Sequence, residues 1–447
     1  MPKMRSMSVI LIVLSSAFSI VTGRWLDQSS GAGTSSYRAV YYGARCLIHH
    51  ADPYNPAEFS RIYTIENGAL PRDPARRPLF LRAVMVCVNL PTTLFLLIPL
   101  ALLPWGLSHL LWLALIAISL TVAAILALDL CCEDDEQLCL ILICLLMSNC
   151  QVLFTVANTA GIAVGLCVIA VWCFVRRRFG WLGVVALAVS LALKPHDSGL
   201  VCIWLIVSGG ALRRRALQSA VLVAAIAIPA TLVVGHSSPH WRTELAGNLA
   251  ETSAHGDISD PGPSSSSRQG SADIIIDLQT VLSLLDDDPR FYNLATYLVC
   301  GLLLVIWLIA AIRRSQPLER AWFAMAFLVA LTMLVSYHRP YDAKLLLLAV
   351  PALSMLGSER TRWRKLASVL ITVSVLFTSD LPLALLAVLT SGIHVSSLGS
   401  VERVLLSPLL RPAPIALLLM SLMFLWIYLH QARVEAPELI LANRGPQ

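Results

Sequence analysis

Long apolar stretches, most of them close to the length of a membrane-crossing helix, follow one another along almost the whole chain. A helix needs about 20 apolar residues to cross the hydrocarbon core of a bilayer. We therefore predict an all-α, polytopic membrane protein with about 11 to 13 transmembrane helices. The candidate segments are residues 7–23, 83–103, 107–130, 138–155, 156–175, 180–194, 198–212, 216–234, 294–312, 321–337, 343–357, 364–379, 381–393 and 412–430.

The composition supports this class. Of the 447 residues, 57% are hydrophobic and only 13% are charged, and the mean hydropathy is +0.74. A soluble globular domain has about 25% charged residues, so that class is excluded. The net charge of +6 is typical of a polytopic protein with basic cytoplasmic loops and requires no nucleic-acid partner.

The sequence contains no motif that indicates a metal or a cofactor. The eleven cysteines lie mostly in apolar runs without paired CxxC spacing, so we interpret them as small buried hydrophobic residues. Neither an HExxH motif nor a glycine-rich phosphate loop is present. We therefore predict no metal site and no cofactor.

Basic clusters predict the orientation, because lysine and arginine in short loops stay cytoplasmic. These clusters are residues 176–178, 213–215, 313–320 and 360–365. The first apolar run follows Lys3 and Arg5 and lacks a clean cleavage site, so it is predicted to be an uncleaved first helix. We expect a bacterial-type inner (plasma) membrane protein with a cytoplasmic N-terminus.

The remaining hydrophilic segments are then predicted to lie outside: residues 24–82, 194–197, 235–293 and 336–344. This count requires residues 138–155 to be a half-helix or a re-entrant segment. If they cross fully, loop 24–82 would be cytoplasmic. This loop holds eight arginines and five acids, and that excess of arginine favours the cytoplasmic alternative. Within the third segment, residues 251–273 are rich in Ser, Pro and Gly and are predicted to be a flexible linker.

Residues 35–56, "SSYRAVYYGARCLIHHADPYNP", have a helical period. The apolar positions are Tyr37, Val40, Tyr41, Ala44, Leu47 and Ile48, and the opposite side carries Arg38, Tyr42, Arg45 and His49. We predict an amphipathic helix in the outer membrane interface, capped by Ser35 or Ser36 and ended by Asp52 and Pro53. The alternative is that this helix only anchors a loop.

Polar residues gather next to helix ends in the predicted outer segments. They are Gln151, Lys194, His196, Asp197, Tyr337, His338, Arg339, Tyr341, Asp342 and Lys344. Together they predict an interfacial pocket that takes a phosphate-bearing lipid from the bilayer and a second substrate from water.

Simpler structural roles remain open for several of these residues. Lys194 either pairs with a lipid phosphate or only extends its ammonium group to the interface. Arg339 and Asp342 are spaced to pair with each other. Gln151 can bind a sugar hydroxyl or the backbone of a half-helix.

Five motifs in succession resemble family 87 glycosyltransferases, polytopic GT-C enzymes similar to the polyprenol-phosphate-mannose-dependent α-mannosyltransferases. They are "YRAVYYGARCLIHHADPYNP" (37–56), "LIPLALLPWGLSHLLW" (97–112), "NCQ" (149–151), "LALKPH" (191–196) and "SYHRPYDAKLLLLAVPAL" (336–353). The resemblance implies a GT-C-like catalytic module over residues 1–360, which includes the outer loops 24–82 and 235–293. Residues 361–447 would be C-terminal transmembrane helices.

The resemblance also implies an activity. A hexose, mannose in these relatives, would move from a polyprenyl-phosphate donor to an acceptor glycan or glycolipid on the non-cytoplasmic face, without a nucleotide sugar. Membrane lipid and both substrates are the implied partners. An acid in the first outer loop would act as general base, which supplies about 10² to 10⁴ in rate. Ser36 and Arg38, with the outer residues above, would bind substrate.

At the position expected for that acid this sequence has Ser36, whose hydroxyl cannot act as a base without an activator. Asp27 or Asp52 could take the role, or the base lies elsewhere, or the protein only binds its ligand. Asp52 before proline is also a common turn former. A transporter or a non-catalytic binder of lipid-linked sugars is therefore the alternative function, and a membrane scaffold a third. Transporter sites usually lie near the bilayer midplane, whereas these polar residues gather at one surface.

Overall fold

The computed structural model describes residues 2–30, 34–71, 73–132, 135–263, 275–313, 318–356, 361–390, 393 and 398–430. Every regular element within these ranges is a helix. A helix satisfies its own backbone hydrogen bonds, as any segment exposed to hydrocarbon must. The prediction of an all-α polytopic membrane protein is confirmed, because several helices are long and apolar enough to cross a membrane.

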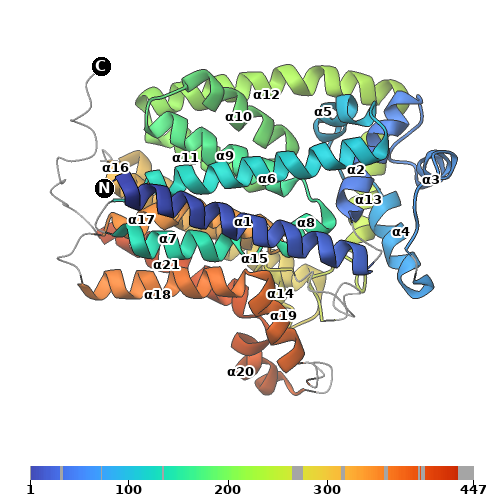
Figure 1. The fold of residues 1–447 in the computed structure, drawn as a ribbon. Coiled ribbons are helices and arrows are strands. Elements are labelled where there is room, and N and C mark those ends of the chain that lie inside the picture. Colours follow the sequence, from blue (N-terminus) through green and yellow to red (C-terminus); the bar gives the residue numbers. More distant parts are fainter. Residues whose placement is uncertain are drawn as a thin grey trace.

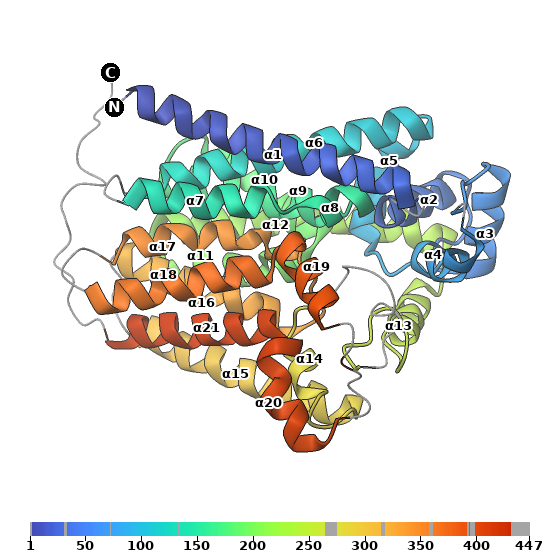
Figure 2. The same ribbon diagram turned by 60° about the horizontal axis from the view of Figure 1, so that its bottom comes forward.

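The long helices run side by side along one direction (Figures 1 and 2). By length and composition, six of the described spans could cross a membrane, and the bent pair α18 (Thr361–Phe377) and α19 (Asp380–Leu389) would make a seventh. The six are α1 (Pro2–Ser30), α6 (Trp105–Asp129), α7 with α8 (Glu136–Met147 and Gln151–Val156), α12 (Gly210–Ser237), α15 (Pro289–Arg313) and α21 (Pro412–His430).

Shorter helices complete the bundle and its ends. The predicted count of about 11 to 13 crossings is higher because it included segments that form only short or broken helices. In the bundle these are α9 (Ala160–Val175), α10 (Gly180–Leu193), α11 (Pro195–Ser208), α16 (Leu318–Val335), η4 (Asp342–Leu348) and α17 (Val350–Ser354). The others are α2 (Ser35–Ile48), α3 (Pro56–Ile65), η1 (Pro74–Arg76), α4 (Arg77–Met85), α5 (Pro91–Ala101), α13 (Trp241–Thr252), α14 (Gln279–Leu282) and α20 (Ser400–Leu410).

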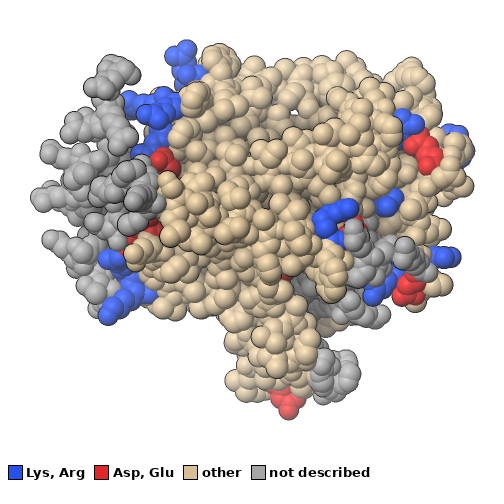
Figure 3. Space-filling view, viewed as in Figure 1, with Lys and Arg blue, Asp and Glu red and all other residues tan. Residues whose placement is uncertain are grey.

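The two ends of the bundle differ in content. Helices α2, α3, α4 and α13 gather at one end, which we name the α2 end (Figures 1 and 2). The opposite end, the arginine end, includes Arg176, which pairs with Asp129 at 3.0 Å, and Arg364, which pairs with Asp135. Charged side chains lie at both ends, and the band between them carries almost none on the face shown in Figure 3. This pattern is typical of a protein that spans a bilayer.

Two predicted segments differ from the structure. Residues 83–103 were predicted to cross, but they are divided between α4 and α5, with extended backbone at Val86 and a helix start at Pro91. Residues 138–155, predicted to be a half-helix or a re-entrant segment, form α7 and α8, which together are long and apolar enough for one full crossing. The first difference removes one predicted crossing and the second adds one, so the number of crossings is unchanged. Loop 24–82 therefore still lies at the same end as loop 336–341.

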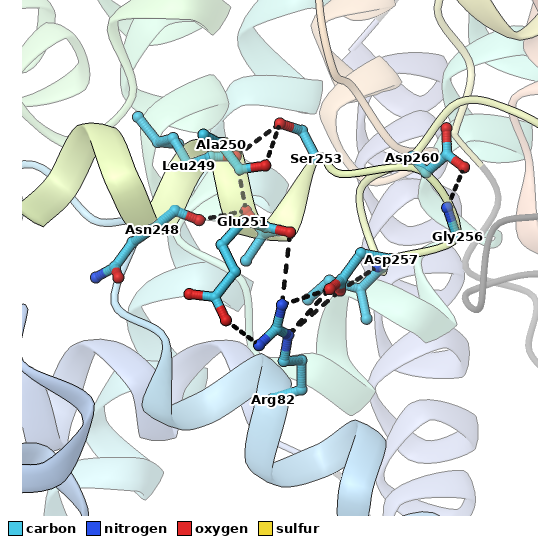
Figure 4. A network of polar contacts seen from close by, with 11 residues as sticks. Arg82, Asn248, Leu249, Ala250, Glu251, Ser253, Gly256, Asp257 and Asp260 are labelled. Carbon is cyan, nitrogen blue, oxygen red and sulfur yellow. Dashed lines mark hydrogen bonds and ion pairs between the residues drawn. The ribbon is translucent and has the colours of Figure 1, made fainter. Parts of the chain in front are cut away.

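The first half of the predicted linker is ordered. Arg82 of α4 donates to Asp257 at 3.1 Å and also pairs with Glu251 of α13, as Figure 4 shows. Asp260 is buried and accepts a hydrogen bond from the Gly256 amide at 2.7 Å. These contacts hold residues 251–260 against α4, contrary to the predicted flexibility. Residues 264–273 of the same prediction lie outside the described residues.

Helices α6 and α9 pack closely because α9 presents a glycine at the contact. A Cβ atom added to Gly165 would lie 2.8 Å from the backbone carbonyl carbon of Ser119. Small residues of this kind let helix backbones approach each other in membrane proteins. By contrast, a Cβ atom added to Gly301 of α15 would meet nothing within 4 Å.

We therefore predict opposite effects for two alanine substitutions. Gly165→Ala should destabilise the protein by about 1–3 kcal/mol because the added methyl group overpacks α6 against α9. Gly301→Ala should be neutral or stabilising by up to about 1 kcal/mol, since alanine favours helix. Thermal unfolding of the purified proteins in detergent tests this, and equal midpoints would contradict the close contact.

Candidate functional site

The helix predicted at the start of the first polar loop is confirmed as α2 (Ser35–Ile48), but its surroundings differ from the prediction. Tyr42, expected on the water side, is only 3% exposed, and Ala39 beside it is also buried. Helices α3, α4 and α5 pack against α2, so both of its faces are covered. The N-cap is Thr34, without a side-chain cap, and not Ser35 or Ser36.

Aromatic rings fix the start of α2 on α6. Tyr37 stacks on Trp112 with ring centroids 4.9 Å apart, and its hydroxyl group lies 2.5 Å from that of Ser108. The guanidinium group of Arg38 lies 4.3 Å above the ring of Trp105. The Thr34 amide donates to the Thr155 carbonyl of α8 at 2.6 Å, and the Thr155 hydroxyl group donates to the Gly23 carbonyl of α1 at 3.1 Å, so the start of α2 lies at the junction of α1, α2 and α8.

Asp27 and Ser36 share that junction. Asp27 pairs with Arg24 at 3.2 Å, and the charge of Arg38 also acts on it. The hydroxyl group of Ser36 accepts a hydrogen bond from Asn158 at 3.1 Å. Asp27, at the end of α1, is therefore within electrostatic reach of Arg38 in the first turn of α2.

Asp52 has the structural role of a turn former. Its carboxylate accepts a hydrogen bond from the Tyr54 amide at 2.8 Å, and its own amide donates to Glu58 at 2.8 Å. It also contacts Glu244 of α13, whose pKa is raised by burial and by the hydrogen bond with Asp52. Among the described residues, neither Asp52 nor Asp27 forms an ion pair or hydrogen bond with Lys194 or His338.

Five side chains at the α2 end form one charge cluster: Lys194, His196, Asp197, His338 and Asp342. The ammonium group of Lys194 pairs with Asp342 and lies 3.6 Å from Oδ2 of Asp197. Oδ1 of Asp197 lies 3.4 Å from Nε2 of His338 and 3.5 Å from Nε2 of His196. The cluster therefore joins the α10–α11 junction to the loop after α16.

Local sequence explains this arrangement. Pro195 is the first residue of α11, so Lys194 stands between two helices and Asp197 lies in the first helical turn. On the other side, Asp342 begins η4 and accepts a hydrogen bond from the Arg339 amide at 2.8 Å, which closes the turn. Thr93 of α5 donates to the Leu193 carbonyl at 3.0 Å and ties the junction to the α2 end.

The predicted pairing of Arg339 with Asp342 through side chains is not what the structure shows. The Arg339 guanidinium group contacts the Tyr337 hydroxyl group and donates to the Ile258 carbonyl at 2.9 Å. The carboxylate of Asp342 binds Lys194 instead. Arg339 therefore connects the cluster to the ordered part of loop 235–293.

Burial and charge oppose each other in the cluster. Burial alone would lower the pKa of Lys194, but the carboxylates of Asp197 and Asp342 outweigh burial and raise it. Burial likewise lowers the pKa of His338, and the same two carboxylates reverse the effect and raise it. Both side chains are thus held in their charged forms more strongly than in water.

The cluster is open on one side only. The side chain of His196 is 42% exposed and that of Lys194 13%, whereas those of Asp197 and His338 are 0% and 1% exposed. A ligand arriving from outside would therefore meet His196 and Lys194 first. The buried members hold these two in place.

A second polar group lies where α7 and α8 meet. Gln151 donates to the Ser148 carbonyl at 2.8 Å, which is the backbone role considered for it. Lys344 of the buried 3₁₀ helix η4 donates to the Asn149 carbonyl at 2.6 Å. Asp380 of α19 accepts from the Val152 amide at 2.8 Å. These contacts satisfy the backbone at the break.

Asp197, Asp342 and Lys344 counted toward the predicted pocket without an assigned catalytic or substrate-binding role, and the structure buries all three. The spacing of Lys194 and Asp197, three residues apart at a helix start, could have indicated their pairing. No sequence signal links Lys194 to Asp342, since that pair depends on how two distant loops meet.

We predict that Lys194→Met strongly destabilises the protein, because it leaves two buried carboxylates without their cation. Breaking a buried ion pair costs about 3–5 kcal/mol. The double variant Lys194→Met/Asp342→Asn should regain part of this loss, since one charge is removed and the acceptor for the Arg339 amide remains. Thermal unfolding in detergent is the measurement. Arg76→Met is the control, since its exposed pair with Asp73 is worth about 0–1 kcal/mol, and an equal effect of both would contradict the prediction.

Comparison with known proteins agrees with the motif pattern. The family model of glycosyltransferase family 87 matches residues 88–337, more than half of the 447 residues. The match includes the α10–α11 junction, while Asp27, Ser36 and Asp52 precede it. No curated protein and no solved structure matches the chain at a significant level. On its matched sequence and its helical membrane fold, this chain belongs to glycosyltransferase family 87.

Proposed function

We propose that this glycosyltransferase moves a hexose, mannose, from a polyprenyl-phosphate donor to an acceptor glycan or glycolipid on the non-cytoplasmic face of a bacterial-type inner membrane. The observation that carries the proposal is the charge cluster at the end of the bundle, open to a ligand through His196 and Lys194. A lipid-linked phosphate keeps its chain in hydrocarbon and needs cations at the depth where helices end.

The donor phosphate would contact Lys194 and His196, the two accessible members of the cluster. His338, behind them, would balance part of the charge of the two buried carboxylates as the phosphate becomes the leaving group. Arg339 and Tyr337, which contact each other, would border the sugar on the side of loop 235–293. Ser36, Arg38 and Gln151, from the α1–α2 junction and the start of α8, would lie toward the acceptor.

The reaction would be a single displacement. A base takes the proton of the acceptor hydroxyl group while its oxygen bonds to the anomeric carbon. The bond between that carbon and the phosphate oxygen breaks, and the polyprenyl phosphate leaves with the electron pair. The anomeric centre is inverted. Cations placed beside the leaving phosphate lower the barrier because they act where negative charge develops.

Asp27 is the base that the geometry favours. It lies at the same junction as Ser36, and its partner Arg24 lies one helical turn away. Asp52 is already used to bind the Tyr54 amide and to contact Glu244. A carboxylate near Ser36 would occupy the place of the acid that the family pattern has there.

The proposed orientation places the α2 end outside and the arginine end in the cytoplasm, because positive loops are retained on the cytoplasmic side. The start of α1 lies at the arginine end (Figure 1), so the N-terminus would be cytoplasmic. The donor is then met from the outer leaflet.

We predict that Asp27→Asn lowers sugar transfer by about 10² to 10⁴, the usual contribution of a general base, without lowering stability. Asp52→Asn should retain transfer, since asparagine keeps an oxygen that accepts from the Tyr54 amide. The measurement is transfer of radiolabelled mannose from polyprenyl phosphate to endogenous acceptor in membranes.

Asp73→Asn is the control for this pair, since Asp73 is half exposed and contacts only its own neighbours, the Ala75 amide and Arg76, among the described residues. Loss of transfer in Asp52→Asn alone would move the base to Asp52. Full activity in both variants would remove both candidates. No transfer by the wild-type protein, together with binding of the lipid-linked sugar, would favour a non-catalytic binder.

A second prediction concerns orientation. A cysteine at Arg76, whose side chain is 54% exposed at the α2 end, should react with a membrane-impermeant maleimide added to intact cells or spheroplasts. A cysteine at the exposed Arg178 should react only after lysis. The wild-type chain gives the background from its own cysteines. The reverse labelling pattern would place the charge cluster in the cytoplasm and overturn the proposed face.

A further inference from the structure

Three side chains in the charge cluster direct ligand atoms at one point. Oδ1 of Asp197 lies 3.4 Å from Nε2 of His338 and 3.5 Å from Nε2 of His196. One ligand atom from each of the three residues lies within 4.8 Å of the other two. Neither oxygen of Asp197 nor Nε2 of His338 has a hydrogen-bond partner among the described residues, although all three atoms are buried. Buried polar atoms without partners are rare, and each requires a water molecule, an ion or another explanation.

The tautomer of His338 makes this arrangement more specific. Its Nδ1 lies 2.7 Å from the Ser336 carbonyl oxygen, and a carbonyl only accepts hydrogen bonds. The proton therefore resides on Nδ1, and in the neutral ring Nε2 carries a lone pair. That lone pair faces the carboxylate of Asp197, so the two groups attract each other only with a proton or a metal ion between them.

The distances fit a metal ion in that place. Two ligands at about 2.0–2.1 Å from a tetrahedral Zn²⁺ are about 3.3 Å apart. The two measured separations between Asp197 Oδ1 and the histidine nitrogens are close to this value. A proton alone would favour a short linear contact with one histidine, whereas here both imidazoles lie at nearly equal distance from the same oxygen.

The surroundings of the three ligands also match those of a metal site. Oδ2 of Asp197, the oxygen turned away from the histidines, lies 3.6 Å from the Lys194 ammonium group. The Ser336 carbonyl orients His338 from behind. Such outer partners orient metal ligands and fix the histidine tautomer.

We propose that His196, Asp197 and His338 bind a divalent transition-metal cation of the zinc type. Two imidazole nitrogens and one carboxylate oxygen form a ligand set suited to such ions, and three protein ligands leave a fourth position open. The exposed side of His196 places that position toward solvent. Binding releases any proton held on Nε2 of His338. Coordination of the donor phosphate at the open position rests on the proposed function, whereas binding of the metal does not.

The test uses the full-length protein, purified in detergent with an affinity tag that lacks histidine, stripped with a chelator and reloaded. We expect elemental analysis to find one Zn²⁺ per chain, and Co²⁺ to give the visible absorption of a four-coordinate N,O site. Loss of an outer partner of a metal site weakens metal binding by about 10- to 100-fold. His196→Ala removes a ligand, so it should weaken Zn²⁺ binding by more than this. Because 42% of the His196 side chain is exposed, this variant should fold.

His49→Ala is the matched control, since the His49 side chain is 41% exposed and pairs with Glu66 away from the cluster. It should bind like the wild-type protein, and His338→Gln should lose binding as His196→Ala does. Absence of Zn²⁺ from the wild-type chain, or unchanged binding in His196→Ala, would overturn the proposal and leave a proton between Asp197 and His338. Metal binding without any sugar transfer would refute the proposed function and leave this site in place.

Discussion

Hydrocarbon supplies no hydrogen bonds, and this constraint orders the whole structure. Where the helices are continuous, the backbone N–H and C=O groups form hydrogen bonds with each other. Where a span is broken, at residues 148–150 between α7 and α8, other segments supply the missing partners. Ser19 of α1 accepts from the Cys150 amide at 3.1 Å, and Lys344 donates to the Asn149 carbonyl. An irregular backbone at this depth therefore requires polar side chains from distant parts of the sequence, and the fold brings them there.

The same constraint explains why the charge cluster is compact. Each carboxylate taken out of water must be matched by a cation at short range. Asp197 and Asp342 share Lys194, and Asp197 also faces two histidines, so the charges cannot be separated without a large energetic loss. A site of this kind is rigid before any ligand arrives, which suits the positioning of a phosphate during group transfer.

Local patterns in the sequence predicted the helical elements but not how they meet. The period of residues 37–48 gave α2, because it depends only on neighbouring side chains. The burial of Tyr42 was not predicted, since α5 and the end of α4 come from a segment that apolar composition alone assigned to the bilayer. Composition could not reveal that Val86 to Pro91 interrupts that segment.

Pairs between distant loops were the least predictable feature. Arg339 and Asp342 have the spacing of a helical ion pair, but the turn between them directs the carboxylate toward Lys194. Likewise, the Ser- and Gly-rich residues before 264 are ordered because Arg82 reaches them from α4. Their own composition contains no sign of that arginine.

The buried 3₁₀ helix η4 has a mechanical consequence. Its seven residues carry Asp342, which faces the α10–α11 junction, and Lys344, which faces the break between α7 and α8. Two residues apart on a helix of three residues per turn, they point about 120° apart around its axis. This one short helix thus binds two breaks between helices of the bundle. A rotation of η4 about its axis would break both contacts at once.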